Sequence, residues 1–138
     1  MELWKIFLAL GFGLSFFLLF ERKKKWNSDL LRWCITGSLF VIGIVGFIIE
    51  KMNKTDYGFS FLCTPIVYNC FDRWFKYLSI KKYGKDFYLW LRYSDEIDYI
   101  WGVNPHVKAL DKLFSVLLLF IATGSTLLPM LVSKFNNH

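Results

Sequence analysis

The stretch that organises this chain is LFSVLLLFIATGSTLLPMLVS, residues 113–133. It contains no charged side chain, and Lys112 and Lys134 flank it. A helix rises ~1.5 Å per residue, so a segment of this length covers ~30 Å, the thickness of the hydrocarbon core of a bilayer. The stretch therefore predicts a membrane-spanning helix at about residues 110–133.

Two earlier apolar runs predict two more spans. Residues 6–20 carry no charge, and the preceding Lys5 can reach the head groups along its aliphatic stem, which extends this span to about 3–20. Residues 33–49 are also free of charge, which predicts a span at about 31–49. Because the polar connection between them is short, we expect an antiparallel helical hairpin.

The composition supports a bilayer as the solvent of this chain. Hydrophobic residues make up 55% of the 138 residues and aromatic residues 20%, more than a soluble domain of this size can readily bury. The basic cluster follows the first apolar run instead of preceding it, which argues against a cleaved signal peptide. We therefore expect one all-α, multi-pass membrane domain over residues 1–138, with three transmembrane helices, in the plasma (or bacterial inner) membrane.

Between the second and third spans, residues 51–104 form an insert that is predicted to be helical and amphipathic. Thr64-Pro65 is a typical helix start, and Gly84 is expected to end that helix. Asn69, Asp72, Arg73 and Lys76 share a polar side. Apolar residues at helical spacing form a candidate interface helix on the opposite side: Val67, Phe71, Trp74, Phe75 and Leu78. Such a helix lies along a membrane surface or packs onto the bundle.

The remainder of the insert allows several interpretations. Residues 57–71 are free of charge but polar in part, so an interfacial or re-entrant segment is favoured, with a fourth span left open. Asp86 is expected to cap a short helix that carries Phe87, and Ser94 to start another that ends at Gly102. Asn104-Pro105 is expected to open the third span.

The net charge of +6 is concentrated beside the apolar runs. Arg22, Lys23, Lys24 and Lys25 form a row that most often fixes topology and that is also a candidate contact for lipid head groups. The number of basic residues near span ends favours an orientation with the 21–32 loop and the C-terminal tail in the cytoplasm. The N-terminus and the insert would then lie on the other side of the membrane. Nucleic acid is not expected as a partner.

Small residues within the spans are candidate points of close helix packing. In the first span these are Gly11 and Ser15, in the second Gly43 and Gly46, and in the third Ala122 and Gly124. The alternative interpretation of the first pair is that glycine is simply common in membrane spans.

The sequence shows no set of residues typical of catalysis. Nucleotide-binding, hydrolase and metal-binding motifs are absent, and no Cys-x-x-Cys pair occurs, so no cofactor or metal is expected. The grouping most similar to an active site is Asp95, Glu96 and Asp98 near His106. Three acids at a helix start more often interact with the helix dipole.

These observations favour a non-enzymatic membrane protein. We expect an accessory or interaction subunit that binds other membrane chains, or its own copies, through the aromatic and basic insert. One alternative is a homo-oligomeric pore or small-solute conduit, based on the small residues from Ala122 to Thr126. A second is a membrane enzyme that acts on lipid through the acidic cluster and His106.

Overall fold

The computed structural model describes residues 3–24, 27–55, 58–91 and 106–136, with side chains in the last range through Ser125 and at Leu127. Within these ranges the regular secondary structure is all helix, with no strand, which confirms the all-α prediction there. The elements are α1 (Leu3–Phe20), α2 (Asp29–Asn53), the short 3-10 helix η1 (Phe59–Cys63), α3 (Thr64–Tyr83) and α4 (Ala109–Asn136).

Local signals place most of the helix ends. Ser28 caps α2 by accepting a hydrogen bond from the backbone N–H of Leu31 at 3.3 Å. At the other end, Lys54 takes a left-handed conformation with φ of 53° and donates its N–H to the carbonyl of Glu50. The predicted stop after Tyr83 is confirmed, because Gly84 has a φ of 72°.

The start of α3 differs in detail from the prediction. The helix begins at Thr64 with Pro65 in its first turn, as expected. The Thr64 hydroxyl, however, donates to the carbonyl of Phe61 at 2.9 Å and does not cap the helix. Thr64 therefore joins η1 to α3, so that residues 59–83 form one nearly continuous helical rod.

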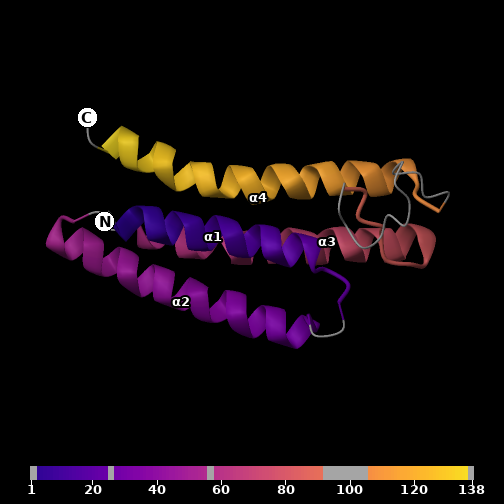
Figure 1. Cartoon of the computed structure of the whole chain (residues 1–138), viewed down its shortest axis with the longest axis horizontal. Helices are drawn as coiled ribbons and strands as arrows, with labels where there is room; N and C mark the ends of the chain where they lie inside the picture. The colour runs from indigo at the N-terminus through magenta and orange to yellow at the C-terminus, as the bar shows by residue number, and fades with distance from the viewer. Residues whose placement is uncertain (1–2, 25–26, 56–57, 92–105, 137–138) are drawn as a thin grey trace.

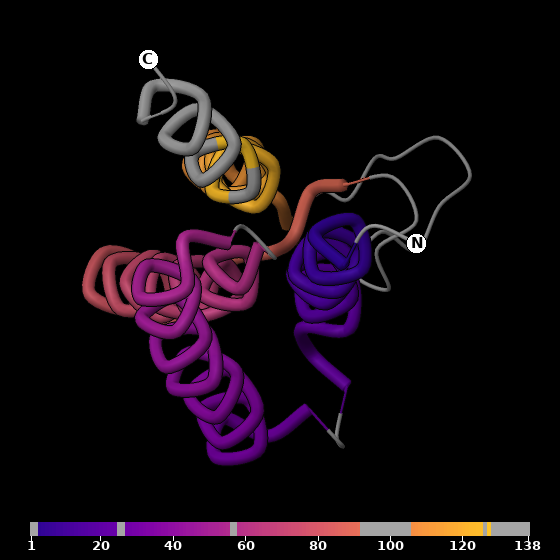
Figure 2. The backbone as a smooth tube through the Cα atoms, turned by 90° about the vertical axis from the view of Figure 1, so that its left-hand side faces the viewer, coloured from indigo at the N-terminus to yellow at the C-terminus, as the bar shows by residue number. Residues whose placement is uncertain are grey.

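That rod is the central element of the fold. α3 packs against α1, α2 and α4, and η1 lies between α1 and α2 (Figures 1 and 2). α1 and α2 run in opposite directions but make little or no direct contact with each other. The expected antiparallel arrangement of the first two helices is therefore confirmed, but they do not pack on each other because η1 and α3 separate them.

Glycines make this central position possible. The backbone carbonyl of Phe61 lies against Gly11 of α1, where a Cβ would overlap it. On the other side, the ring of Phe59 fills the space beside Gly46, and the Cys63 sulfur lies 2.8 Å from where a Cβ of Gly43 would be. The three glycines thus let η1 fit between the two flanking helices.

The hydrophobic core lies between α1, α3, α4 and the segment after α3. Its buried residues are Leu18, Leu19, Tyr68, Phe75, Phe87, Leu89, Phe114, Leu118 and Ala122. The rings of Phe75 and Phe114 stack with centroids 4.7 Å apart. α2 contributes no residue to this core, and much of its apolar surface is exposed.

The insert expected over residues 51–104 is helical only in part within the described residues. Residues 51–53 belong to α2, and residues 84–91 are not helical. The short helix expected after Asp86 is wrong, because the Asp86 carboxylate binds Arg22 and does not cap a helix. The helix expected between Ser94 and Gly102 lies outside the described residues.

α4 begins later than Asn104-Pro105 predicts. Residues 106–108 are not helical, and the first helical residue is Ala109. The carboxylate of Asp111 accepts a hydrogen bond from the Lys108 N–H at 2.8 Å, as an acid in the first turn does in a capping box. This bond sets the start of α4.

Candidate functional site

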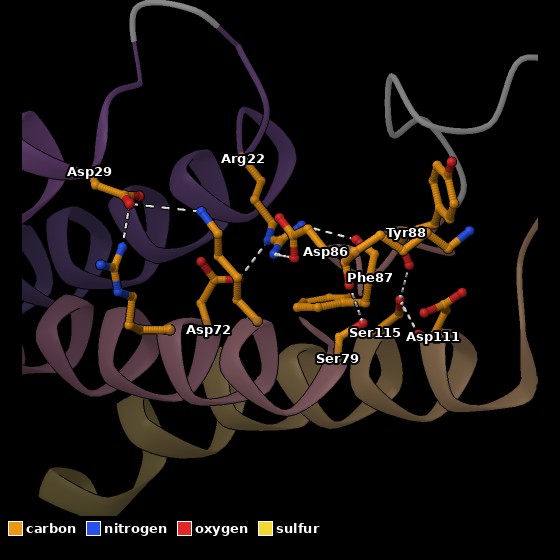
Figure 3. Close-up of polar contacts among 12 residues, drawn as sticks. Arg22, Asp29, Asp72, Ser79, Asp86, Phe87, Tyr88, Asp111 and Ser115 are labelled. Atoms are coloured by element: carbon orange, nitrogen blue, oxygen red, sulfur yellow. Dashed lines mark hydrogen bonds and ion pairs between the residues drawn. The ribbon is translucent and has the colours of Figure 1, made fainter. Parts of the chain in front are cut away.

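Arg22 lies just after α1 and is the centre of a buried polar cluster (Figure 3). Its Nε donates to one oxygen of Asp72 in α3 at 2.6 Å. Its Nη2 donates to Asp86 at 2.6 Å, and its Nη1 donates to the carbonyl of Phe87 at 3.2 Å. The guanidinium also lies 3.9 Å from the centroid of the Phe87 ring. All three nitrogens of one side chain therefore tie α1 to α3 and to the segment that follows α3.

Asp72 binds a second arginine. Its other oxygen lies 2.9 Å from Nη2 of Arg32, in the first turn of α2. The side chains of Arg22, Arg32 and Asp72 are 3–5% exposed, so their charges are removed from water. Two arginines facing two aspartates form a neutral group, which offsets much of the cost of burying the charges. This ion-pair cluster joins α1, α2 and α3.

The pKa of Arg22 follows from this arrangement. Burial by itself lowers the pKa of the guanidinium, but the charges and hydrogen bonds of Asp72 and Asp86 outweigh burial and raise it. Arg22 therefore stays charged, and the cluster acts as a fixed structural clamp. A proton relay needs a group that gains and loses a proton, which Arg22 does not do.

Residues 85–91, which we call the strap, cross from α3 to α4. Ser79 of α3 donates to the carbonyl of Lys85 at 3.0 Å. Ser115 of α4 accepts from the Trp90 N–H at 2.7 Å and lies within hydrogen-bond distance of the Tyr88 carbonyl (Figure 3). The buried ring of Phe87 meets Phe114 edge to face. Side-chain hydrogen bonds to both helices thus hold an irregular segment in a defined path.

Lysines and aromatic rings alternate on the surface around the strap. Lys23 and Lys85 lie 4.6 and 4.7 Å from the centroid of the Tyr88 ring. Lys112 lies 4.9 Å from a Trp90 ring, and Lys108 lies 4.0 Å from Tyr83. These cation–π contacts bring together residues from the 21–28 loop, α3, the strap and α4. We call this surface the lysine-rich end.

The four candidate lipid-contact residues have different surroundings. Arg22 is buried and paired with carboxylates, so it is not presented to a head group. Lys23 and Lys24 are exposed, and Lys24 also pairs with Glu21 at 2.8 Å. Lys25 lies outside the described residues.

The candidate interface helix is divided between the core and the surface. Phe75 is buried, and Phe71 and Leu78 pack against the core. Val67 and Trp74 are exposed, at 38% and 53%. The opposite side, which the sequence marks as polar, is partly buried: Asp72 binds the two arginines, and Asn69 donates to Thr36 at 3.4 Å. The helical periodicity predicted for this segment is thus present in α3, but the polar residues of α3 face α2 and the 21–28 loop.

The candidate packing residues also differ among themselves. Gly11, Gly43 and Gly46 contact η1, as described above. Ser15 is buried and donates to the carbonyl of Gly11 at 2.8 Å. Ala122 is buried in the core, whereas a Cβ on Gly124 would meet nothing within 4 Å. The hydroxyls of Thr123 and Ser125 bond to carbonyls of their own helix.

The enzyme alternative gains no support from the described residues. His106 is exposed, and Asp95, Glu96 and Asp98 lie outside the described ranges. Among the residues that the structure describes, no three His, Cys, Asp or Glu side chains are grouped to hold a metal ion.

No model of a known protein family matches this chain, and searches of curated proteins and of solved structures find no match either. α1 and α2 are long and apolar enough to cross a membrane, each with a mean hydropathy of 2.0. Length and composition alone are weak evidence, since a signal sequence or a core helix of a soluble protein can pass the same test. A core helix is mostly buried, however, and only 22% of each of these segments is buried.

Proposed function

We propose that this protein is a multi-pass membrane protein that acts by binding a partner membrane chain, without catalysis of its own. The observation that carries this proposal is the outer side of α3. There a row of exposed aromatic and apolar side chains projects from a helix whose inner side is fixed by the core and by the ion-pair cluster.

The membrane location is supported by the surface of α2. This helix faces η1 and α3 on one side only, and on the other it exposes a continuous apolar surface: Val41, Ile42, Ile44, Val45, Phe47, Ile48 and Ile49. Soluble monomers rarely expose apolar patches of this extent. Lipid tails solvate such a surface without cost.

The outer side of α3 has the geometry of a helix-docking surface. Val67, Cys70, Trp74 and Tyr77 are exposed and lie three or four residues apart, so they form one stripe along the helix. Trp74 and Tyr77 are 53% and 61% exposed. Large aromatic side chains at this spacing pack well into the grooves of a neighbouring helix. A helix of another membrane chain, or of a second copy, fits this stripe.

The proposal is tested with a photo-crosslinking amino acid placed at position 74 or 77 in the full-length protein, in its native membrane. We expect a protein adduct of higher mass from both positions. The matched control is position 113, because Leu113 of α4 is 52% exposed but lies outside the stripe. Adducts from position 113 alone, or adducts with lipid only at 74 and 77, would contradict the proposal.

A further inference from the structure

Basic side chains gather at one end of the helical bundle. Arg22 and Arg32 lie in the ion-pair cluster, and Arg73 and Lys76 of α3 both pair with Asp29 at the start of α2. Cation–π contacts place the lysines around the strap at the same end. The basic residues placed here by their own contacts or by their position in α3 are Arg22, Lys23, Lys24, Arg32, Arg73, Lys76, Lys81, Lys82, Lys85, Lys108 and Lys112.

The opposite end carries few basic residues. Lys5 stands at the start of α1, Lys51 and Lys54 at the end of α2, and Lys134 near the end of α4. Figure 1 shows the start of α1 and the end of α4 at this same end. Basic residues are therefore unevenly distributed along the bundle, although the sequence distributes them over separate segments.

The segment from Gly58 to Asp72 connects the two ends. Gly58 lies against the Cβ of Trp4, at the start of α1, and further along Thr64 lies against Gly11. Asp72 reaches Arg22, beyond the end of α1. The segment thus runs beside the whole length of α1.

We infer that the chain crosses the membrane four times, with residues 58–72 as the third and shortest crossing. The lysine-rich end then faces the cytoplasm and contacts the negatively charged phospholipid head groups of that leaflet. The inference rests on the proposed membrane location but not on the proposed partner chain. It differs from the three-span arrangement, in which α3 and the strap lie on the side opposite the 21–32 loop.

The length of the segment suits a crossing. A 3-10 helix rises ~2.0 Å per residue, so η1 together with α3 as far as Asp72 covers about 24 Å, close to the ~27 Å of α1. Both are somewhat shorter than an average hydrocarbon core, which a bilayer accommodates by local thinning. The 15 residues from 57 to 71 carry no charge.

Several polar groups of the segment have hydrogen-bond partners, as a bilayer requires, whereas the buried Tyr68 hydroxyl has none among the described residues. Thr64 donates to Phe61, and Asn69 donates to Thr36. The first backbone N–H of η1, that of Phe59, is bound by the Glu50 carboxylate at 3.1 Å. Asp72, the first charge after this run, stands at the lysine-rich end and is paired with two arginines. Unpaired polar groups would be costly at this depth.

Charge statistics then fix the orientation. Basic residues near span ends remain in the cytoplasm, and lysines near the surface are attracted by anionic lipids of the inner leaflet. With three crossings, the basic residues would be divided between the two sides. With four, eleven of the fifteen basic residues in the described ranges lie on one side.

The test is cysteine labelling in cells with a maleimide that does not cross membranes. Three variants, Lys24→Cys, Lys82→Cys and Met52→Cys, are made in full-length protein that carries Cys34→Ser, Cys63→Ala and Cys70→Ser. We expect position 52, at the exposed end of α2, to react in intact cells. Positions 24 and 82 should react only after the membrane is permeabilised.

Each other pattern overturns the inference. Reaction of 24 and 82 from opposite sides indicates three crossings, reaction of all three from one side indicates fewer, and the reversed pattern contradicts the orientation. If alkaline carbonate extracted the protein from membranes, the proposed membrane location would be contradicted, and the proposed function with it. Absence of a crosslink at position 74 would contradict the proposed partner chain but would not affect the four crossings, which the labelling tests separately.

The lipid contact is tested with an environment-sensitive fluorophore on the same purified variants in vesicles. Adding phosphatidylglycerol to phosphatidylcholine should shift the emission of the label at position 82, and high salt should reverse the shift. The label at position 52 is the control and should not respond. An equal response at both positions, or none at position 82, would contradict the contact.

Discussion

The Asp72 carboxylate lies 2.6 Å from the Arg22 guanidinium, although fifty residues separate them in the chain. This pair, together with Arg32, fixes the position of α3 along α1 and α2. An apolar contact would allow α3 to slide along its neighbours, whereas a charged pair with hydrogen bonds fixes the register.

Replacing Asp72 by asparagine should destabilise the fold by about 3–5 kcal/mol, because it removes the carboxylate that pairs with the buried Arg32 and leaves the buried Arg22 with Asp86 alone. The loss is measured by thermal unfolding in mild detergent. Asp29→Asn is the matched control, since Asp29 also pairs with basic residues of α3 but is 49% exposed. That change should cost ~1 kcal/mol or less. Equal losses in the two variants would show that the cluster adds nothing beyond a surface ion pair.

Gly11→Ala should destabilise the protein by about 1–3 kcal/mol, because the new Cβ meets the backbone of Phe61, which cannot rotate away. Gly13→Ala, two residues further along the same helix, meets nothing within 4 Å and should leave stability unchanged or slightly raised. The same unfolding measurement compares the two. If they behave alike, η1 does not approach α1 as closely as described.

Ser115→Ala should loosen the strap. The Trp90 N–H then loses its acceptor, at a cost of ~1–3 kcal/mol if it stays buried. Hydrogen exchange at Trp90 should become roughly tenfold faster or more, while exchange in α1 stays the same. Ser38→Ala is the control, because this exposed hydroxyl binds only a carbonyl of its own helix. Unchanged exchange at Trp90 would mean that other contacts hold the strap.

The limits of α1, α2 and α4 were largely predictable, because each helix contains a charge-free run whose flanking charged residues mark its approximate ends. The predicted limits 3–20 coincide with α1, and 31–49 and 110–133 lie within α2 and α4. Proline and glycine likewise marked both ends of α3. These signals are local, so a single sequence contains them.

The ion-pair cluster was not predictable in the same way. Helical periodicity places Asp72 beside Lys76 on a polar side, and nothing local shows that this side faces two arginines. The available signal was positional: Arg32 precedes one charge-free run and Asp72 follows another. The helix cap predicted at Asp86 fails for a related reason: an acid before an apolar residue resembles a helix cap, but the partner of Asp86 is Arg22, 64 residues away in the sequence.

The central position of η1 and α3 has a consequence for synthesis. α1 and α2 emerge from the ribosome before η1 and α3, which join them within the described residues, and Asp72, which binds Arg22, is synthesised fifty residues after it. Nascent chains that end before η1, at residue 59, should therefore hold α1 and α2 as independent helices that quality-control proteases can cleave. Chains that extend past the strap should resist them. Limited digestion of stalled ribosome complexes of graded length would locate that transition, and equal resistance at all lengths would rule out late assembly.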